Sequence, residues 1–419
     1  MRGHFHIHIV SMVFPPERGA ARRIGELAQF LSAAGHTVTV VTCLPNYPRG
    51  IIFPGYQNAL LQKEKWNEDV SVYRVLTHIS RNRQSSFSRA LTYLSFAIFS
   101  LIGLMAGPKP DVVYVASPPY FLGLTGWVAC VLRRSKLVMD IQDLWPDAPI
   151  ALGYIKSKWM IQLLKAIEQF IYARASLVFT ISETMRTLVA ERVKDGSKVW
   201  LVCNWVDLKE SGPVDGMALK FSLGFEGKFI ALFAGNIGKA QGLDMVLDAA
   251  RECVNNPDVQ FVVLGDGIEK ERMMNRAEQL SMRNISFLDP VPEDQVPAHL
   301  GMADVLLVTL ARAKHREAVI PSKLQVYMAS AKPIVVAAEG AAAEVVRIAN
   351  CGITAAPHDG KALAEAVDAV RRMSNSERDR LGQAGRLYAQ EHFSMKRQCA
   401  EIERHLVELA RGGVNEVRA

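Results

Sequence analysis

The sequence predicts an α/β protein built from two Rossmann-like, doubly wound domains. Short apolar runs typical of buried parallel strands alternate with segments of helical periodicity along nearly all of the 419 residues. A chain of this length holds two or three domains, and we expect two. The predicted first domain spans 1–208 and the second spans 209–393, and residues beyond 394 have the pattern of a further helix.

Composition and charge narrow the class of protein. Hydrophobic residues make up 49% and charged residues 22%, which are globular values. The six cysteines are scattered without a CxxC pair, so the sequence suggests neither a zinc site nor a disulfide framework and favours a reducing cytosol. The N-terminal apolar run is too short for a signal peptide.

The net charge of +7 is concentrated in the first half, where residues 1–205 hold 23 basic and 13 acidic side chains. A basic face attracts nucleic acid, an anionic membrane or an anionic substrate, and many basic faces are merely solvated. Nucleic acid is the least favoured of these, because there is no aromatic-rich RNA motif and no helix-turn-helix signature.

The elements of the first domain follow from its hydrophobic pattern. β-Branched and apolar runs predict strands, and apolar residues at helical spacing predict helices. Prolines and glycines make 45–56 a long loop, of the kind that is often functional. We expect strands at 5–13, 37–42, 111–116, 136–141, 177–181 and 199–202, and helices at 20–33, 90–106, 122–132 and 157–175.

The stretch Ala90–Ala106, ALTYLSFAIFSLIGLMA, has 17 residues without a charge. It falls short of the roughly 20 apolar residues of a spanning helix. A helix that dips into a membrane face, with flanking arginines on anionic headgroups, is favoured over a buried core helix and over a true span. The expected membrane contacts are Arg81, Arg83, Arg89, Phe96, Phe99 and Leu101.

Carboxylates follow the predicted strand Lys136–Ile141, in the segment Gln142–Asp147. The carboxyl end of a parallel strand is where such sheets bind ligands, which makes Asp143 a candidate catalytic residue. The alternative is that Asp143 or Asp147 caps the next helix.

The second domain repeats the alternation, and three of its loops are suited to phosphate. Strands are expected at 229–234, 259–264, 285–288, 305–309, 334–337 and 352–355. The glycine loop Gly235–Lys239 could be an ordinary strand-to-helix turn, since its spacing matches no nucleotide fingerprint. However, Gly265–Gly267 and Pro321–Lys323 also follow strands, and Ser322 can cap a helix whose N-terminus, with Lys323, faces an anion. Their convergence at one sheet edge favours a phosphate-binding crevice.

Taken in order, these segments resemble the family 4 retaining glycosyltransferases of the GT-B fold. The matching stretches run from Phe14 to Val335 and include DIQDLWPDAPIALG, NWVD, FAGNIGKAQGLDMVL, GDGIEKERM and PSKLQVYMASAKPIV. Within the family they look similar to bacterial O-antigen and capsule transferases, most of all to those that transfer N-acetyl-L-fucosamine.

The resemblance implies two domains that face across a crevice, an acceptor-binding first domain and a second domain that binds a UDP-sugar. It also implies that a C-terminal helix within 394–419 crosses back to join the first domain. It implies an acceptor linked to a polyprenyl diphosphate, and a cytoplasmic protein held peripherally on the inner face of the bacterial plasma membrane. The donor-binding residues that it implies are Gly19, Asn236, Lys239, Gln241, Gly265, Asp266, Gly267, Pro292, Ser322, Lys323 and Gln325.

The sequence departs from the family at three positions. The paired glutamates align near Ala318 and Val326, so Glu317 becomes the substitute for the first and Gln325 a candidate for the ribose contact of the second. The family's histidine aligns with Gln142, which cannot carry a proton, and Asp143 stands beside it. With Lys323, Asp143 and Glu317 are the expected catalytic residues.

In the front-face mechanism discussed for the family, the leaving diphosphate accepts the proton of the acceptor hydroxyl. The protein then stabilises charge on the diphosphate and orients both substrates. Lysines and helix N-termini can supply that potential, so we expect no metal or other cofactor. A nucleotide-sugar epimerase of the same fold and a silent nucleotide-sugar-binding membrane scaffold remain alternatives.

Overall fold

The computed structural model describes residues 4–17, 19–47, 50–67, 69–80, 86–151, 153, 155–312 and 317–412. Contacts divide the chain into two units, one of residues 1–203 with 398–419 and one of residues 204–397. The first boundary therefore falls after Cys203 rather than after residue 208, and the second after Arg397 rather than after residue 393.

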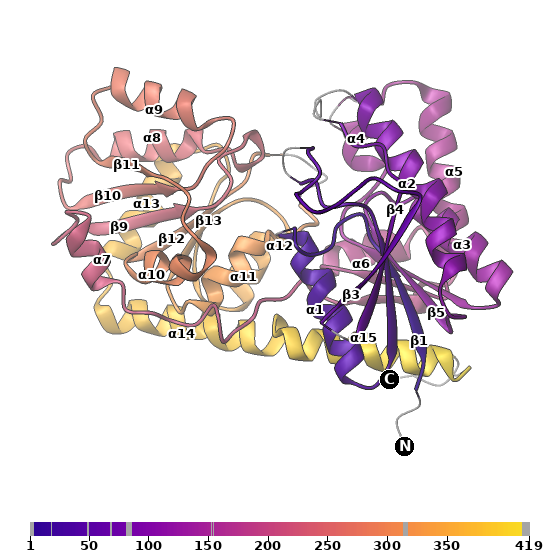
Figure 1. Ribbon diagram of the computed structural model, residues 1–419. Helices are drawn as coiled ribbons and strands as arrows, with labels where there is room; N and C mark the ends of the chain where they lie inside the picture. Colours follow the sequence, from indigo (N-terminus) through magenta and orange to yellow (C-terminus); the bar gives the residue numbers. More distant parts are fainter. Residues whose placement is uncertain are drawn as a thin grey trace. The chain divides into compact units, whose positions relative to one another are not determined.

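The first unit is built on an eight-stranded sheet with the order β3-β4-β2-β1-β5-β6-β7-β8. Figure 1 labels β1, β3, β4 and β5 of this sheet. All neighbouring strands are parallel except β3 and β4. The strands are β1 His6–Val10, β2 Thr37–Thr42, β3 Leu61–Trp66, β4 Val70–Val75, β5 Val112–Ser117, β6 Lys136–Ile141, β7 Leu177–Thr180 and β8 Val199–Leu201.

The hairpin of β3 and β4 was not expected from the sequence. β3, LQKEKW, carries three consecutive charged residues and lies at the sheet edge with its side chains partly exposed. An edge strand needs no continuous apolar run, so the pattern that identifies buried parallel strands does not detect it.

Helices cover both faces of this sheet. Ser182 caps α6 as its position suggests, since its side chain accepts a hydrogen bond from the Met185 amide. The helices are α1 Ala20–Ala33, α2 Ser86–Ala106, α3 Leu122–Arg133, α4 Asp147–Ala151, α5 Lys158–Arg174, α6 Glu183–Ala190 and the C-terminal α15 Met395–Ala410.

The C-terminal helix α15 completes the core of the first unit. Its residues from Gln398 onward belong to that unit, although the preceding helix belongs to the other. Ile402 is fully buried, and the His405 ring lies 4.2 Å from the ring of Trp200 at the end of the sheet. Most of α15 is therefore part of the first unit.

The second unit is a six-stranded parallel sheet with the order β11-β10-β9-β12-β13-β14. Its strands coincide with the predicted ones: β9 Phe229–Ala234, β10 Val259–Leu264, β11 Ile285–Leu288, β12 Val305–Thr309, β13 Ile334–Ala337 and β14 Gly352–Ala355. Its helices are α7 Met217–Ser222, α8 Asp244–Glu252, α9 Lys270–Gln279, α10 Val296–Gly301, α11 Ser322–Ala329, α12 Ala341–Ile348, α13 Gly360–Arg372 and α14 Asn375–His392.

Alternate strand residues of this sheet pack under different helices. Phe229, Ala231 and Phe233 of β9 share one buried cluster with side chains of α8, α9 and α13, while α11 packs on β12 and on α14. Short 3-10 turns at Lys239–Gln241 and Glu293–Gln295 lie in the loops that follow β9 and β11. Both units therefore have the doubly wound topology that the sequence predicts.

The apolar helix α2 packs along the first unit as one of its covering helices. It contacts β2, β4 and α3, and an added Cβ on its Gly103 would lie 2.6 Å from Val41 of β2. The described chain has one helix, Phe87–Ala106, that is long and apolar enough to cross a membrane by length and composition. Its close packing on the sheet leaves one apolar face of the helix outside the core.

Candidate functional site

The loops at the carboxyl ends of β9, β10 and β11 line a cavity of about 610 Å³ in the second unit, and this cavity is open to solvent. The volume is within the usual range for ligand sites, roughly 300–1,000 Å³. Its lining combines these loops with α10 and the first turns of α11. The lining residues are Ala234, Gly235, Asn236, Gln241, Leu264, Gly265, Asp266, Pro290, Val291, Val296, Leu300, Pro321, Ser322, Lys323, Val326 and Tyr327.

The two glycine loops are held directly against each other. Gly265 has φ 141° and lies so close to Gly235 that an added Cβ would come within 2.0 Å of the Gly235 carbonyl oxygen. The Ile237 amide donates to the Asp266 carbonyl, and the Glu269 amide donates to the Ile237 carbonyl. Glycine is needed at Gly265 because a side chain would separate the loops that form the cavity floor.

Lys323, at the second position of α11, is the cation of this cavity. Its Nζ donates to Gln241 Oε1 at 2.6 Å and lies 3.7 Å from the centre of the Phe233 ring. Burial lowers the pKa of Lys323 to about 7. A helix N-terminus adds positive potential at the same place, so this end of the cavity is suited to an anion.

Tyr327 fixes α11 against β9. Its hydroxyl accepts from the Ala234 amide at 2.7 Å and donates to the Ala234 carbonyl at 2.9 Å. Because Lys323 stands one helical turn earlier, this anchor also places the lysine beside the loop after β9. Tyr327 and Val326 were not predicted as site residues, although their spacing of four and three residues from Lys323 indicated the same helix face.

Several predicted donor residues meet at this cavity. Asn236, Gln241, Gly265, Asp266, Ser322 and Lys323 all line it. The N-cap of α11 is Pro321 rather than Ser322, and no side-chain cap bond is made. Lys239, Gly267 and Pro292 lie on the same loops but outside the lining, and Gly267 packs against the Ile237 backbone.

The expectation for Gln325 is wrong. This side chain is 1% exposed, and its Nε2 donates at 2.7 Å to the backbone carbonyl of Asn204. Adjacent helix positions point about 100° apart, so Val326 faces the cavity while Gln325 faces the start of the second unit. Gln325 cannot reach a ribose in the cavity.

Glu317 is not brought together with Lys323. It lines a separate small hollow with Arg312 and Glu339, at the ends of β12 and β13. Its backbone carbonyl accepts the Ala341 amide at the start of α12. The role of Glu317 in catalysis stays a prediction.

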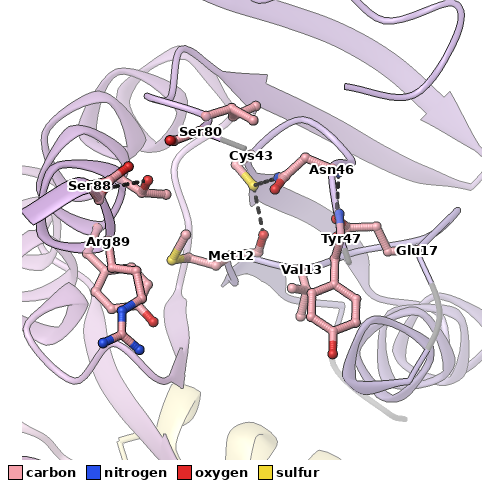
Figure 2. A pocket seen from close by; sticks show the side chains of 12 residues that line it. Met12, Val13, Glu17, Cys43, Asn46, Tyr47, Ser80, Ser88 and Arg89 are labelled. Atoms are coloured by element: carbon pink, nitrogen blue, oxygen red, sulfur yellow. Dashed lines mark hydrogen bonds between the residues drawn. The ribbon is translucent and has the colours of Figure 1, made fainter. Parts of the chain in front are cut away.

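The first unit has its own small cavity, of about 80 Å³, at the carboxyl end of its sheet (Figure 2). It lies among the segments after β1, β2 and β4 and the first turns of α2. Glu17 Oε1 accepts the backbone amides of Asn46 and Tyr47, both at 2.7 Å. The cavity wall on α2 carries Ser88, Arg89, Thr92 and Tyr93.

Asp143 and Gln142 follow β6 at the same edge of the sheet. Desolvation raises the pKa of Asp143 to about 6. Gln142 Nε2 donates to Asp140 Oδ1 at 2.7 Å, and Asp140 is itself buried and paired with Arg23 at 2.6 Å. Gly19 precedes α1 with φ 70°, and open space lies beside its Cα.

The expected membrane contacts of α2 need correction. Phe96 is wrong, because its side chain is 0% exposed in the core. Phe99 and Leu101 are half-buried, Arg89 lines the small cavity, and Arg81 and Arg83 lie outside the described residues. The exposed apolar face instead consists of five side chains at helical spacing, Phe87, Leu91, Leu94, Ile98 and Ile102.

Two family models match the chain. The model of the glycosyl transferase 4-like domain matches residues 18–205, and that of the glycosyl transferases group 1 matches residues 218–388. The putative colanic acid biosynthesis glycosyl transferase WcaI of Escherichia coli (strain K12) is 31% identical over 343 residues, which cover 80% of this chain and 83% of WcaI. The chain belongs to the group 1 glycosyltransferases.

Solved structures agree on the fold. A sucrose-phosphate synthase from Thermosynechococcus elongatus superimposes with a TM-score of 0.76 at 18% identity, covering 98% of this chain and 100% of that one. Anabaena HepE, solved in complex with UDP, has a TM-score of 0.72 at 15% identity over 96% of this chain and 99% of its own. These neighbours show that the chain has the GT-B fold. Because the chain belongs to a family of glycosyltransferases, it is an enzyme.

Proposed function

We propose that this glycosyltransferase moves a sugar, with retention of configuration, from a UDP-sugar to a saccharide linked to polyprenyl diphosphate. The sugar that we propose is an N-acetylated deoxyhexosamine such as N-acetyl-L-fucosamine, and the product enters an O-antigen or capsule. The observation that carries the donor assignment is the cavity of the second unit. It combines Lys323, amide side chains and a helix N-terminus with an apolar wall.

The chemistry requires positive potential more than a protein base. As the bond between the anomeric carbon and the diphosphate breaks, the leaving oxygen gains negative charge, and Lys323 with the α11 N-terminus stabilises it. The acceptor hydroxyl forms the new bond from the same face and gives its proton to the departing diphosphate. Asp143, whose pKa is raised to about 6, is assigned to position that hydroxyl.

We place the acceptor and the membrane on the first unit. The small cavity beside α2 offers Arg89 and hydroxyl groups for the polar part of the acceptor. The exposed face of α2 lies on the same helix as that cavity wall, and interfacial helices bury such a face in the headgroup region. We propose a peripheral enzyme on the cytoplasmic side of the inner membrane.

The names of similar proteins support this assignment. The relative from Escherichia coli is named for colanic acid biosynthesis, and HepE was solved in complex with UDP. Both fit a transferase that uses a nucleotide diphosphate sugar to build a polysaccharide.

The first experiment is thermal stabilisation by UDP, GDP, dTDP and their sugars, because a bound ligand raises stability according to its concentration relative to its Kd. UDP is expected to stabilise the wild type, and Lys323→Ala to lose most of that response. Lys361→Ala, which removes an exposed lysine of α13, is the matched control and should respond as the wild type does. Stabilisation by no nucleotide would overturn the donor assignment and leave a silent membrane scaffold.

Transfer itself is tested with the sugar that stabilises best and a lipid-linked acceptor. Activity should survive EDTA, since we assign the charge on the diphosphate to Lys323 and the helix N-terminus. Product formed from the nucleotide sugar without acceptor would instead indicate an epimerase.

A further inference from the structure

The donor cavity has an order of chemical groups along the edge of its sheet. The loop after β9 brings Asn236 and Gln241, which lie with Lys323. β10 is the next strand and contributes Asp266, and β11 is one strand further and contributes Pro290 and Val291. Because neighbouring strands are about 4.8 Å apart, the apolar end lies about 10 Å from the loop after β9, which we assign to the phosphate groups.

This order matches the parts of a nucleoside diphosphate. A diphosphate beside Lys323 leaves the ribose over the loop after β10 and the base against the apolar groups after β11. The wall of α11 offers the ribose no free polar partner one turn beyond Lys323, since Val326 is apolar and the Tyr327 hydroxyl is bonded to the Ala234 backbone. The amide of Gln325 is bonded to Asn204.

Asp266 is the one carboxylate among the described residues that line the cavity. Its Oδ1 accepts the Gly267 amide at 2.8 Å, which fixes the orientation of the carboxylate. Its Oδ2 has no hydrogen-bond partner in the described part of the chain, and the residue is exposed. A carboxylate held in this way can accept hydrogen bonds from two neighbouring hydroxyls.

We infer that Asp266 binds the ribose hydroxyls of the donor nucleotide and makes the enzyme select ribonucleotides over deoxyribonucleotides. The inference rests on the proposed donor site and assigns a specificity-determining residue within it. A hydroxyl bonded to a carboxylate is a charge-assisted hydrogen bond, and a deoxynucleotide forgoes that bond. The expected preference for UDP over 2′-deoxy-UDP or 3′-deoxy-UDP is about tenfold or more in Kd.

The test compares the Kd of UDP with those of 2′-deoxy-UDP and 3′-deoxy-UDP by calorimetry. Asp266→Asn keeps an acceptor for the Gly267 amide and removes the charged oxygen, so its preference should fall to about threefold or less. Asp294→Asn removes an exposed carboxylate on the neighbouring loop that does not line the cavity, and should keep the wild-type ratio. The ratio within one variant cancels any general effect of charge or stability.

The outcomes separate this inference from the proposed function. If UDP binds but the deoxy forms bind equally well, or if Asp266→Asn keeps the wild-type ratio, the role of Asp266 is overturned and the donor site stands. If none of the three nucleotides binds the wild type, the donor site itself fails. A wild-type preference that Asp266→Asn removes and Asp294→Asn retains supports the inference.

Discussion

The ammonium group of Lys323 is partly buried and has no carboxylate partner among the described residues. One amide oxygen and the face of Phe233 are its partners in the described part of the chain, and burial lowers its pKa to about 7. A diphosphate placed at Nζ would supply the missing counter-charge and raise the pKa of the lysine. The residue is therefore suited to an anion that comes and goes.

This predicts proton uptake on donor binding. Below pH 7 the free lysine is already protonated, so the affinity for UDP-glucose is constant. Above pH 7 each binding event must take up a proton, and the affinity should fall by up to tenfold per pH unit. Calorimetry between pH 6 and 8.5 measures this, since the diphosphate of UDP-glucose does not titrate there. Lys323→Met should bind weakly with a flat profile, and a flat wild-type profile would contradict the assignment.

His8 makes the first unit sensitive to acid. It is 0% exposed on β1, and burial together with nearby Arg133 lowers its pKa from 6.5 to about 4. Between these values the unfolded chain binds a proton that the folded chain does not. The contribution of neutral His8 to the free energy of unfolding is therefore fully present above pH 6.5. It is lost as the pH falls to 4, which lowers the free energy of unfolding by about 3 kcal/mol at most.

Urea unfolding at pH 7 and pH 4.5 tests this prediction. His8→Asn should lose less stability between the two pH values than the wild type does, whatever its stability at pH 7. The exposed His78→Asn is the control and should keep the wild-type difference. Equal pH dependence in the wild type and His8→Asn would show that His8 does not contribute.

At the scale of elements, α2 is apolar on two opposite faces. One face packs on β2 and β4, and the other leaves Leu94 54% and Ile98 58% exposed. An exposed stripe of this kind is costly in water and favours an interface. We predict that the full chain binds vesicles containing anionic lipid, and that Leu94→Glu with Ile98→Glu weakens binding at least about tenfold.

The matched control is Phe221→Glu on α7 of the second unit, a side chain that is 66% exposed. It removes a comparable apolar group away from α2 and should bind vesicles as the wild type does. Vesicle flotation measures the bound fraction of the wild type and of both variants. If the α2 double variant floats like the wild type, the membrane contact lies elsewhere.

The same elements show how far sequence reasoning reaches. The strands of the second unit were predicted to the residue, and the central ones were the clearest because a strand covered on both faces is largely apolar. The direction in which each helix residue faces was not predicted as well, because Phe96 and Gln325 were each assigned to the wrong face of their helix. In an all-apolar helix periodicity carries no signal, and next to Lys323 a shift of one residue turns a side chain by about 100°.

The candidate site was predicted only in part. The loops after β9 and β10 and the start of α11 were predicted because glycine, serine and lysine after a strand have a direct physical meaning. Val326 and Tyr327 line the cavity without such a signature, and their roles depend on the packing of α11 against β9. Glu317 was placed by alignment alone, and the fold sends it to another hollow.

At the scale of the whole molecule, the N-terminal and C-terminal segments of the chain fold into the same unit. The first unit needs residues from Gln398 onward, while the second is one continuous segment, 204–397. Ile402 is fully buried in the first unit, and Val407 on the same helix is only half-buried. A cavity at Ile402 should therefore weaken the first unit and leave the donor site of the second intact.

We predict that Ile402→Ala destabilises the first unit by about 2–4 kcal/mol, the usual cost of truncating a buried isoleucine. Val407→Ala should cost clearly less. Calorimetry with and without UDP separates the units, because UDP raises only the transition of the unit that binds it. Ile402→Ala should lower the UDP-insensitive transition and leave the Kd for UDP unchanged. If the variant lowers both transitions equally, the units unfold as one, and α15 stabilises the whole enzyme rather than the first unit alone.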